Sequence, residues 1–430
     1  MNCAMKSPKT PSDPPVLHRA AWLVGKSGPP VENGTVLVRD GVILAAGAYP
    51  DVEKQCPAGA RCEDHGDSAI LPGLVNAHTH LELSSLHGEI PLPTPDFRAW
   101  LNEVLARRGA LTPDTLQRGI VEGDGRLAAG GTALAGDVSN GAGLFVKKNG
   151  TRTPRHTFLE PLGFDRQGLE SALGADLFQA LCRAATGSVM VGASAHSCYS
   201  NSAGLITEAK AWSRERQRPF SIHVAEHADE IEFLMTGKGF CLEILERLGR
   251  AAPGWTPPGL SPIRYLESLG VLDPQTLLVH AVHMNAKDWE TAARHGCPVC
   301  FCPRSNRSLN VGRADVEKAI ALGMVTALGT DSLASNRDLN LFEEAGCLLE
   351  EHPNIRPETV LTMMTVGGAA ALGQSHLFGS IEPGKRAFLL AVNVADSPGR
   401  SQLAETLIRQ GRKGAWQWAN HPGIDSNSEE

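Results

Sequence analysis

The chain has 430 residues, more than one small domain needs, and this length predicts two or three domains. A formal net charge of −7, without a long cluster of lysine or arginine, excludes the basic surface that nucleic acids or anionic membranes require. No apolar run approaches the roughly 20 residues of a membrane span. We therefore expect a cytoplasmic protein that acts on a small molecule, with no nucleic-acid or membrane partner and with a homodimer as one option. The ten cysteines are expected to be reduced thiols.

The two ends of the chain have a β-like pattern. Residues 1–15 combine lysines and prolines with no apolar segment, which predicts a disordered leader. Short strands separated by glycine and proline turns are then expected at 20–24, 34–38 and 42–46. Beyond residue 375, the segment 379–393 returns to this pattern. We predict one small discontinuous β-sandwich domain made of residues 16–71 and 375–430.

Between these parts, apolar strands alternate with helix-length segments. Eight strands are predicted, the first ending at His78 and the others at residues 132–137, 155–160, 189–196, 220–226, 276–282, 298–303 and 326–331. Helices are expected between them, among others at 112–129, 204–216, 228–234 and 286–295. This alternation predicts an α/β fold, a (β/α)₈ TIM-type barrel that forms the catalytic domain over residues 72–374. In such barrels the catalytic residues lie at the carboxyl ends of the strands.

Ionisable and polar side chains gather at the predicted strand ends. His78 and His80 lie two residues apart, so their imidazoles would share one face of a strand. This spacing alone is not specific, because a chain with 15 histidines contains about half a His-x-His pair by chance. The other strand ends carry Asp137, Glu160, His196, His223, Glu226, His280, His283, Ser305, Asn306 and Asp331. Their convergence predicts a single site.

Three imidazoles and a carboxylate suit Zn²⁺ or Fe²⁺ and also tolerate Mn²⁺. The ligands expected for one divalent metal ion, with zinc as the first choice, are His78, His80, His223 and Asp331. A bound cation lowers the pKa of its water to about 7, which makes hydrolysis possible at neutral pH. Glu226 is expected to carry protons, although it could instead cap the helix at 228–234. His280 could share the proton of the water with Asp331, and His283 is the competing choice.

Four ordered motifs resemble the amidohydrolase superfamily and, within it, the branch of metal-dependent aminohydrolases and chlorohydrolases. They are Pro-Gly-Leu-Val-Asn-Ala-His-Thr-His at 72–80, His-Val-Ala-Glu at 223–226, Cys-Pro-Arg-Ser-Asn at 302–306 and Leu-Gly-Thr-Asp-Ser at 328–332. The resemblance covers nearly the whole chain and implies the same metal ligands, with Glu226 and His280 as proton carriers. Members with two metal ions usually place a carbamylated lysine at the end of the fourth strand. This chain has Ala193-Ser-Ala-His196 there, so the resemblance implies one metal ion.

Within this branch, the chain is similar to deaminases of adenine nucleosides. His-Ser-Cys-Tyr at 196–199 parallels their Pro-His-x-x-Tyr segment, although Ala195 stands in place of the proline. Thr-His-Leu-Glu-Leu-Ser at 79–84 and Phe-Leu-Glu-Pro-Leu-Gly at 158–163 are similar to aminodeoxyfutalosine deaminases. The resemblance implies hydrolytic deamination of a purine nucleoside, with 6-amino-6-deoxyfutalosine of menaquinone synthesis as the first expected substrate. The substrate contacts expected are Glu82, His196, Ser305 and Asn306.

Alternative functions remain open at this point. The chain could deaminate S-adenosylhomocysteine or methylthioadenosine, which are also adenine nucleosides. It could be a triazine-type chlorohydrolase or another amidohydrolase, because these reactions would use the same activated water. A different class is a binding protein that keeps the barrel without catalysis, but the complete set of ligands and proton carriers favours an enzyme.

Overall fold

The computed structural model describes residues 14–25, 28–141, 152–185, 190–395 and 399–422. The chain divides into two compact units, one made of residues 1–73 with 376–430 and the other of residues 74–375. Almost all of the expected leader, and residue 189 at the expected start of the fourth barrel strand, lie outside the described residues. Within the described parts, no helix has the length and apolar character needed to cross a membrane, and every cysteine there is free.

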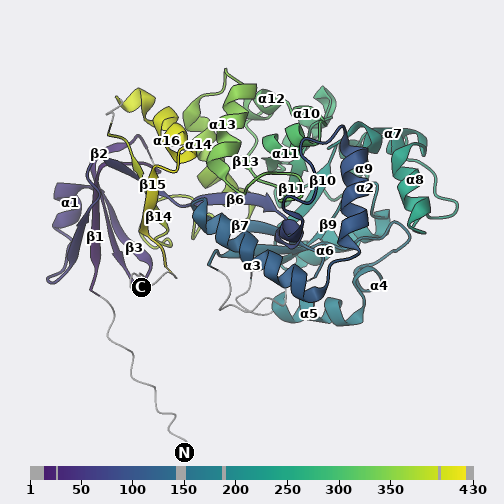
Figure 1. Cartoon of the computed structure of the whole chain (residues 1–430), viewed down its shortest axis with the longest axis horizontal. Helices are drawn as coiled ribbons and strands as arrows, with labels where there is room; N and C mark the ends of the chain where they lie inside the picture. Colours follow the sequence, from purple (N-terminus) through teal and green to yellow (C-terminus); the bar gives the residue numbers. More distant parts are fainter. Residues whose placement is uncertain (1–13, 26–27, 142–151, 186–189, 396–398, 423–430) are drawn as a thin grey trace, which may run out of the picture. The chain divides into compact units, whose positions relative to one another are not determined.

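The first unit is a seven-stranded sheet built from both ends of the chain. Its strands are β1 (Val16–Leu23), β2 (Val31–Arg39), β3 (Val42–Ala48), β4 (Arg61–Asp64), β5 (Ser68–Pro72), β14 (Leu389–Asn393) and β15 (Trp416–Asn420). The strand order is β15-β14-β5-β1-β2-β3, with β4 paired to β1. In Figure 1 the purple N-terminal strands accordingly lie beside the yellow C-terminal strands. The prediction that the two ends build one β module is confirmed.

The core of this module explains why the two ends fold together. Ile70 of β5 and Leu389 of β14 are fully buried in one apolar cluster with Val36 of β2. β14 runs antiparallel to β5, with Leu389 opposite Pro72. The unit also contains the helices α1 (Tyr49–Glu53) and α16 (Leu403–Arg412). Burial of apolar side chains from both ends therefore stabilises this one domain.

The second unit is an eight-stranded parallel sheet in the order β13-β12-β11-β10-β9-β8-β7-β6. Its strands are β6 (Leu74–Thr79), β7 (Thr132–Ser139), β8 (Arg155–Leu159), β9 (Val191–Ala195), β10 (Phe220–Val224), β11 (Thr276–His280), β12 (Val299–Phe301) and β13 (Thr326–Leu328). A parallel bridge between Thr79 and Asp331 brings the first strand together with the segment after the last one. Every residue of β6, β7 and β10 is buried, as expected for parallel strands covered on both faces. The predicted (β/α)₈ barrel is confirmed.

Helices surround the barrel strands, as Figure 1 shows for α3, α13 and their neighbours. They are α2 (Phe97–Arg108), α3 (Pro113–Ala129), α4 (Leu169–Leu173), α5 (Ala175–Ala185), α6 (Ala203–Glu215), α7 (Ala228–Thr236), α8 (Phe240–Arg247), α9 (Pro262–Ser268), α10 (Ala286–Arg294), α11 (Pro303–Ser308), α12 (Val316–Ala321), α13 (Leu341–Glu351), α14 (Pro357–Thr362) and α15 (Gly368–Ala371). Side-chain caps define several starts: Thr112 accepts from the Thr115 backbone N–H and Ser202 from that of Leu205. Such caps satisfy backbone donors that the first helical turn leaves free.

Candidate active site

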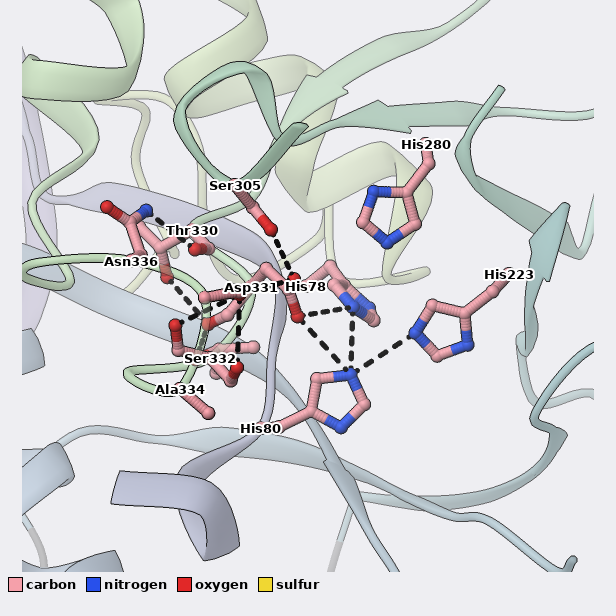
Figure 2. Close-up of polar contacts among 12 residues, drawn as sticks. His78, His80, His223, His280, Ser305, Thr330, Asp331, Ser332, Ala334 and Asn336 are labelled. Atoms are coloured by element: carbon pink, nitrogen blue, oxygen red, sulfur yellow. Dashed lines mark hydrogen bonds and ion pairs between the residues drawn. The ribbon is translucent and has the colours of Figure 1, made fainter. Parts of the chain in front are cut away.

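Three imidazoles and one carboxylate converge at the carboxyl end of the barrel. Nε2 of His80 lies 3.1 Å from Nε2 of His78 and 3.2 Å from Nε2 of His223. Oδ1 of Asp331 lies 3.7 Å from Nε2 of His78 and 3.6 Å from Nε2 of His80. Figure 2 shows the three rings turned toward one another, with the carboxylate of Asp331 beside His78 and His80. Two ligands at about 2.0–2.1 Å from a tetrahedral zinc ion lie about 3.3 Å apart, so the spacing fits one such ion.

Hydrogen bonds set the orientation of His223 and Asp331, whereas Nδ1 of His78 has no hydrogen-bond partner among the described residues. Nδ1 of His223 donates to the carbonyl oxygen of His196 at 2.7 Å, which leaves the lone pair of Nε2 facing the centre. Oδ2 of Asp331 accepts from Ser305 Oγ at 2.6 Å and from Ser335 Oγ at 2.7 Å, so Oδ1 is the oxygen that faces the imidazoles. These contacts direct donor atoms to one point before any ion binds. The geometry and the chemistry of the donors both fit a divalent metal ion.

The backbone at these strand ends is unusual for residues other than glycine. Asp331 has φ +54°, His280 has φ +71° and Ala225 has φ +50°. This left-handed region is costly for side chains with a Cβ atom and is found mainly where function requires it. Asp331 follows β13, His280 is the last residue of β11, and Ala225 follows β10. The fold therefore accepts strain at the positions that aim the polar groups inward.

Burial determines the protonation of the site. Burial lowers the pKa of the three converging imidazoles and of His280, so these rings are neutral near pH 7 and offer lone pairs. Burial alone would raise the pKa of Asp331, but contact with His78 and the nearby imidazoles holds it well below its usual range. Burial, reinforced by the charge of Asp331, raises the pKa of Glu226 well above its usual range.

Glu226 and His280 lie beside the converging ligands. Oε1 of Glu226 is 3.6 Å from Nε2 of His280. Nδ1 of His280 donates to Oδ1 of Asn306 at 2.9 Å, so Nε2 is the nitrogen without a proton. Both residues line the same cavity as His80 and Asp331. A proton donor and a proton acceptor therefore stand next to the converging imidazoles and carboxylate.

The cavity above this site has a volume of about 410 Å³, within the range of small-molecule sites. Its polar part includes His196, Asn140, Glu160 and Arg108, and burial raises the pKa of Glu160 to about 8. Its outer wall is apolar and comes largely from α2 and α8, with Phe97, Trp100, Leu101, Val104, Leu105, Ile244, Leu245 and Leu248. The cavity therefore combines a polar floor with a wall that suits an apolar substituent.

Of the four predicted substrate contacts, one lines the cavity and three lie behind its wall. His196 lines the cavity, where burial lowers its pKa to about 3. Ser305 and Asn306 lie behind the cavity wall, against Asp331 and His280. Glu82 also lies behind the wall, where its carboxylate accepts from the backbone N–H groups of Asn140 and Gly141 at 3.2 and 3.1 Å.

Two further strand-end residues lie away from the reacting centre. Asp137 is buried, accepts from the backbone N–H of Leu81 at 3.1 Å and lies 3.7 Å from Arg155. His283, the alternative to His280, pairs through Nε2 with the carbonyl oxygen of Val311 at 2.9 Å. Neither residue lines the cavity.

Sequence reasoning missed several groups of the site. Ser335 lies in the loop after β13, and Arg108 ends α2, so neither stands at a strand end. Asn140 follows β7 directly and belongs to the strand-end pattern, which could have identified it. The apolar wall from α2 and α8 carried no recognisable motif.

A second cluster of ligand-type side chains lies in the β module. Nδ1 of His18 is 3.2 Å from Nε2 of His65 and 3.4 Å from Oε2 of Glu63. Nε2 of His18 is buried and has no hydrogen-bond partner among the described residues. A proton on Nδ1 of His18, shared between His65 and Glu63, accounts for these contacts, and the Glu63 carboxylate is exposed, so this cluster offers fewer buried ligands than the barrel.

Comparisons with known proteins agree with this geometry. The model of the amidohydrolase family matches residues 69–414. An aminodeoxyfutalosine deaminase of Deinococcus radiodurans is 31% identical over 363 residues, covering 81% of this chain and 83% of that protein. A 5-methylthioadenosine/S-adenosylhomocysteine deaminase of Nitratidesulfovibrio vulgaris is 30% identical over 380 residues, covering 85% and 80%. The chain belongs to the amidohydrolase family, and the resemblance seen in its motifs is confirmed.

Solved structures share the fold at lower identity. The aminofutalosine deaminase of Helicobacter pylori, in complex with methylthio-coformycin, superposes with a TM-score of 0.79 at 22% identity, covering 91% of this chain and 96% of that one. An adenosine deaminase of Xanthomonas campestris with bound zinc gives a TM-score of 0.74 at 22% identity, covering 95% and 94%. These similarities extend the shared architecture over almost the whole chain.

Proposed function

We propose that the protein is a metal-dependent hydrolase that removes the exocyclic amine of an adenine-type nucleoside as ammonia. The observation that carries this proposal is the pairing of Glu226 with His280 beside the converging ligands, at the floor of a cavity of about 410 Å³. His78, His80, His223 and Asp331 would hold one divalent ion, with zinc as the first choice because three neutral imidazoles and a carboxylate suit it. When bound, the ion lowers the pKa of a coordinated water and supplies a nucleophile at neutral pH.

The residues of the chain have separate tasks in this reaction. Glu226 keeps its proton because burial raises its pKa, so it can protonate the ring nitrogen next to the carbon that bears the amine. Loss of aromaticity at that carbon then becomes less costly. Nε2 of His280 and Oδ1 of Asp331 orient the attacking water and accept its proton. Glu226 then accepts the remaining proton of the added hydroxyl group as the carbonyl forms, the proton held at His280 passes to the amine, and the amine leaves as ammonia.

The substrate proposed first is 6-amino-6-deoxyfutalosine. The relative from Deinococcus radiodurans bears the name of that activity, and the apolar wall from α2 and α8 favours a nucleoside with a large substituent over free adenosine. The second candidate is methylthioadenosine or S-adenosylhomocysteine, named for the relative from Nitratidesulfovibrio vulgaris. Both candidates present the same aminated ring to the floor of the cavity.

Ammonia release from a substrate panel tests the proposal. The zinc-loaded protein would be given 6-amino-6-deoxyfutalosine, methylthioadenosine, S-adenosylhomocysteine, adenosine and a chlorinated triazine. We expect ammonia from the adenine nucleosides, fastest from 6-amino-6-deoxyfutalosine. Chloride release without ammonia would instead establish a chlorohydrolase, and the absence of turnover on every compound would favour a binding protein.

Substitution of Glu226 tests its proposed task. Glu226→Gln keeps the size of the side chain but removes the proton donor, so kcat/KM should fall by roughly 10²- to 10⁴-fold. Metal content, measured by elemental analysis, should stay at the wild-type value because Glu226 is not in the ligand set. The control is Glu232→Gln, an exposed residue on the following helix α7, which should keep full activity. Undiminished turnover by Glu226→Gln would remove this residue from the mechanism.

A further inference from the structure

The cavity contains a carboxyl group that the proposed chemistry does not use. Glu160 follows β8 directly, lines the cavity and is 4% exposed. Its Oε1 atom is buried and has no hydrogen-bond partner among the described residues. A buried polar atom without a partner destabilises the folded chain, so such atoms normally pair with water or with a ligand.

Neighbouring groups hold the rest of this carboxyl group in place. Nδ2 of Asn140 donates to Oε2 of Glu160 at 3.2 Å and to its carbonyl oxygen at 2.8 Å. Arg108 in turn donates to Oδ1 of Asn140. The carboxylate of Glu82 accepts from the backbone N–H of Asn140 at 3.2 Å and lies 3.7 Å from the guanidinium of Arg108. The arrangement occupies Oε2 and leaves Oε1 as the oxygen that can bind something else.

The position of Oε1 relates it to the reacting centre. Oε1 lies 3.7 Å from Nδ1 of His223, on the side of the ring opposite the Nε2 atom that faces His80. The proton on Nδ1 of His223 is already donated to the carbonyl oxygen of His196, so His223 does not satisfy Glu160. Glu160 thus stands one imidazole ring away from the converging donors, on the wall of the cavity proposed to hold the substrate.

We propose that Glu160 pairs through Oε1 with a ribose hydroxyl of the nucleoside and so selects ribonucleosides over deoxyribonucleosides. This inference rests on the proposed function. Besides the reacting amine, an adenine ring offers the acceptors N3 and N7 but no further N–H donor. A hydroxyl both donates and accepts, so it can pair with a carboxyl group in either protonation state. The ring nitrogens N3 and N7 pair only with a protonated carboxyl group, whereas ribose hydroxyls match Glu160 in both protonation states.

The test compares substrates and variants in one cycle. The zinc-loaded wild type and Glu160→Ala would be assayed with adenosine, 2′-deoxyadenosine and 3′-deoxyadenosine, and calorimetry would give the Kd values of inosine and its two deoxy forms. In the wild type, loss of the paired hydroxyl should lower kcat/KM and weaken inosine binding by roughly 10- to 100-fold. In Glu160→Ala, the ribo and deoxy compounds should have nearly equal kcat/KM values and nearly equal Kd values. Asp124→Ala, which removes a buried carboxylate outside the cavity, should retain the wild-type discrimination.

Each possible result either supports or overturns the pairing of Glu160 with a ribose hydroxyl. Equal treatment of ribo and deoxy compounds by the wild type overturns it, as does equal loss on all substrates in Glu160→Ala. If Glu160→Ala does not fold, Glu160→Gln replaces it: reduced discrimination supports the inference, and unchanged discrimination overturns it. Failure of the proposed function is recognised separately, because no adenosine compound would then release ammonia. In that case the inosine series alone decides whether Glu160 binds a ribose hydroxyl.

Discussion

At the scale of single residues, the orientation of Asp331 depends on two hydroxyl groups. Ser305 and Ser335 both donate to Oδ2, at 2.6 and 2.7 Å, and all three side chains are buried. Without these donors, Oδ2 would be unsatisfied and the carboxylate could rotate away from the imidazoles. Removal of a group that orients a metal-binding side chain typically lowers activity or metal affinity by 10- to 100-fold.

Ser335→Ala is therefore expected to lower kcat/KM and zinc affinity by about 10- to 100-fold. The measurement is a zinc titration against a competing chelator, run beside the ammonia assay. Ser171→Ala, an exposed serine in α4, is the matched control and should change neither quantity. Wild-type affinity in Ser335→Ala would mean that Ser305 alone is sufficient to orient Asp331.

His156 provides a prediction about pH. It is fully buried in β8, neither ring nitrogen has a hydrogen-bond partner among the described residues, and burial lowers its pKa to about 3. Because the unfolded chain binds a proton near pH 6.5 and the folded chain does not, stability falls as the pH drops below about 6.5. Between pH 7 and pH 5 this residue should account for about 2 kcal/mol of lost stability.

His156→Leu should flatten this part of the stability profile. Urea unfolding midpoints at pH 7 and pH 5 would measure it, with the exposed His376→Leu as control. We expect the midpoint of the wild type and of the control to fall between these pH values by more than that of His156→Leu. Parallel profiles for all three proteins would show that His156 is protonated in the folded state.

Sequence reasoning at the residue scale succeeded where strand periodicity applies. His78, His80 and His223 were predicted to face one centre because they end buried strands, and the structure brings these three together. Sequence reasoning did not identify Ser335 or Arg108. The conformation of a loop and the direction of a helix depend on contacts with residues far away along the chain. The pairing of Asn76 with Thr330 at 2.7 Å, across 254 residues, is one such contact.

At the scale of elements, the close approach of β6 and β13 requires a residue without a side chain. A Cβ atom on Gly329 would lie 2.8 Å from Cβ and from the carbonyl oxygen of His78. These atoms belong to His78 in β6 and cannot move without displacing that strand. Gly329→Ala should therefore lower stability by roughly 1–3 kcal/mol and reduce zinc occupancy.

The matched control for this change is Gly125→Ala within α3, where an added Cβ atom meets nothing within 4 Å. Alanine is the better helix former, so this variant should gain about 0.5–1 kcal/mol. Thermal unfolding and zinc content of both variants give the comparison. Normal zinc content in Gly329→Ala would show that β6 can shift without disturbing His78.

The elements also show the limit of pattern reasoning. Apolar runs located all eight barrel strands, because parallel strands are buried on both faces. The same runs did not indicate α2 and α8, which form the apolar wall of the cavity. Helices that cover a ligand site expose apolar side chains to the cavity, so their pattern does not separate a core face from a solvent face.

At the scale of the whole molecule, two clusters of histidines lie in separate units of the chain. The barrel cluster joins His78, His80 and His223 with the carboxylate of Asp331, whereas the β-module cluster offers His18, His65 and the exposed carboxylate of Glu63. Only the barrel cluster should bind zinc tightly. Zinc analysis should accordingly find one ion for each chain.

Metal removal should then lower the stability of the folded chain. A ligand that binds only the folded state stabilises it by RT ln(1 + [L]/Kd), which is about 2.7 kcal/mol when free zinc is 100 times Kd. Dialysis against a chelator should reduce the melting temperature, and added zinc should restore it. His80→Ala should melt at the same temperature with or without zinc, whereas His65→Ala should respond like the wild type. A zinc response that persists in His80→Ala and disappears in His65→Ala would place the ion in the β module and not in the barrel.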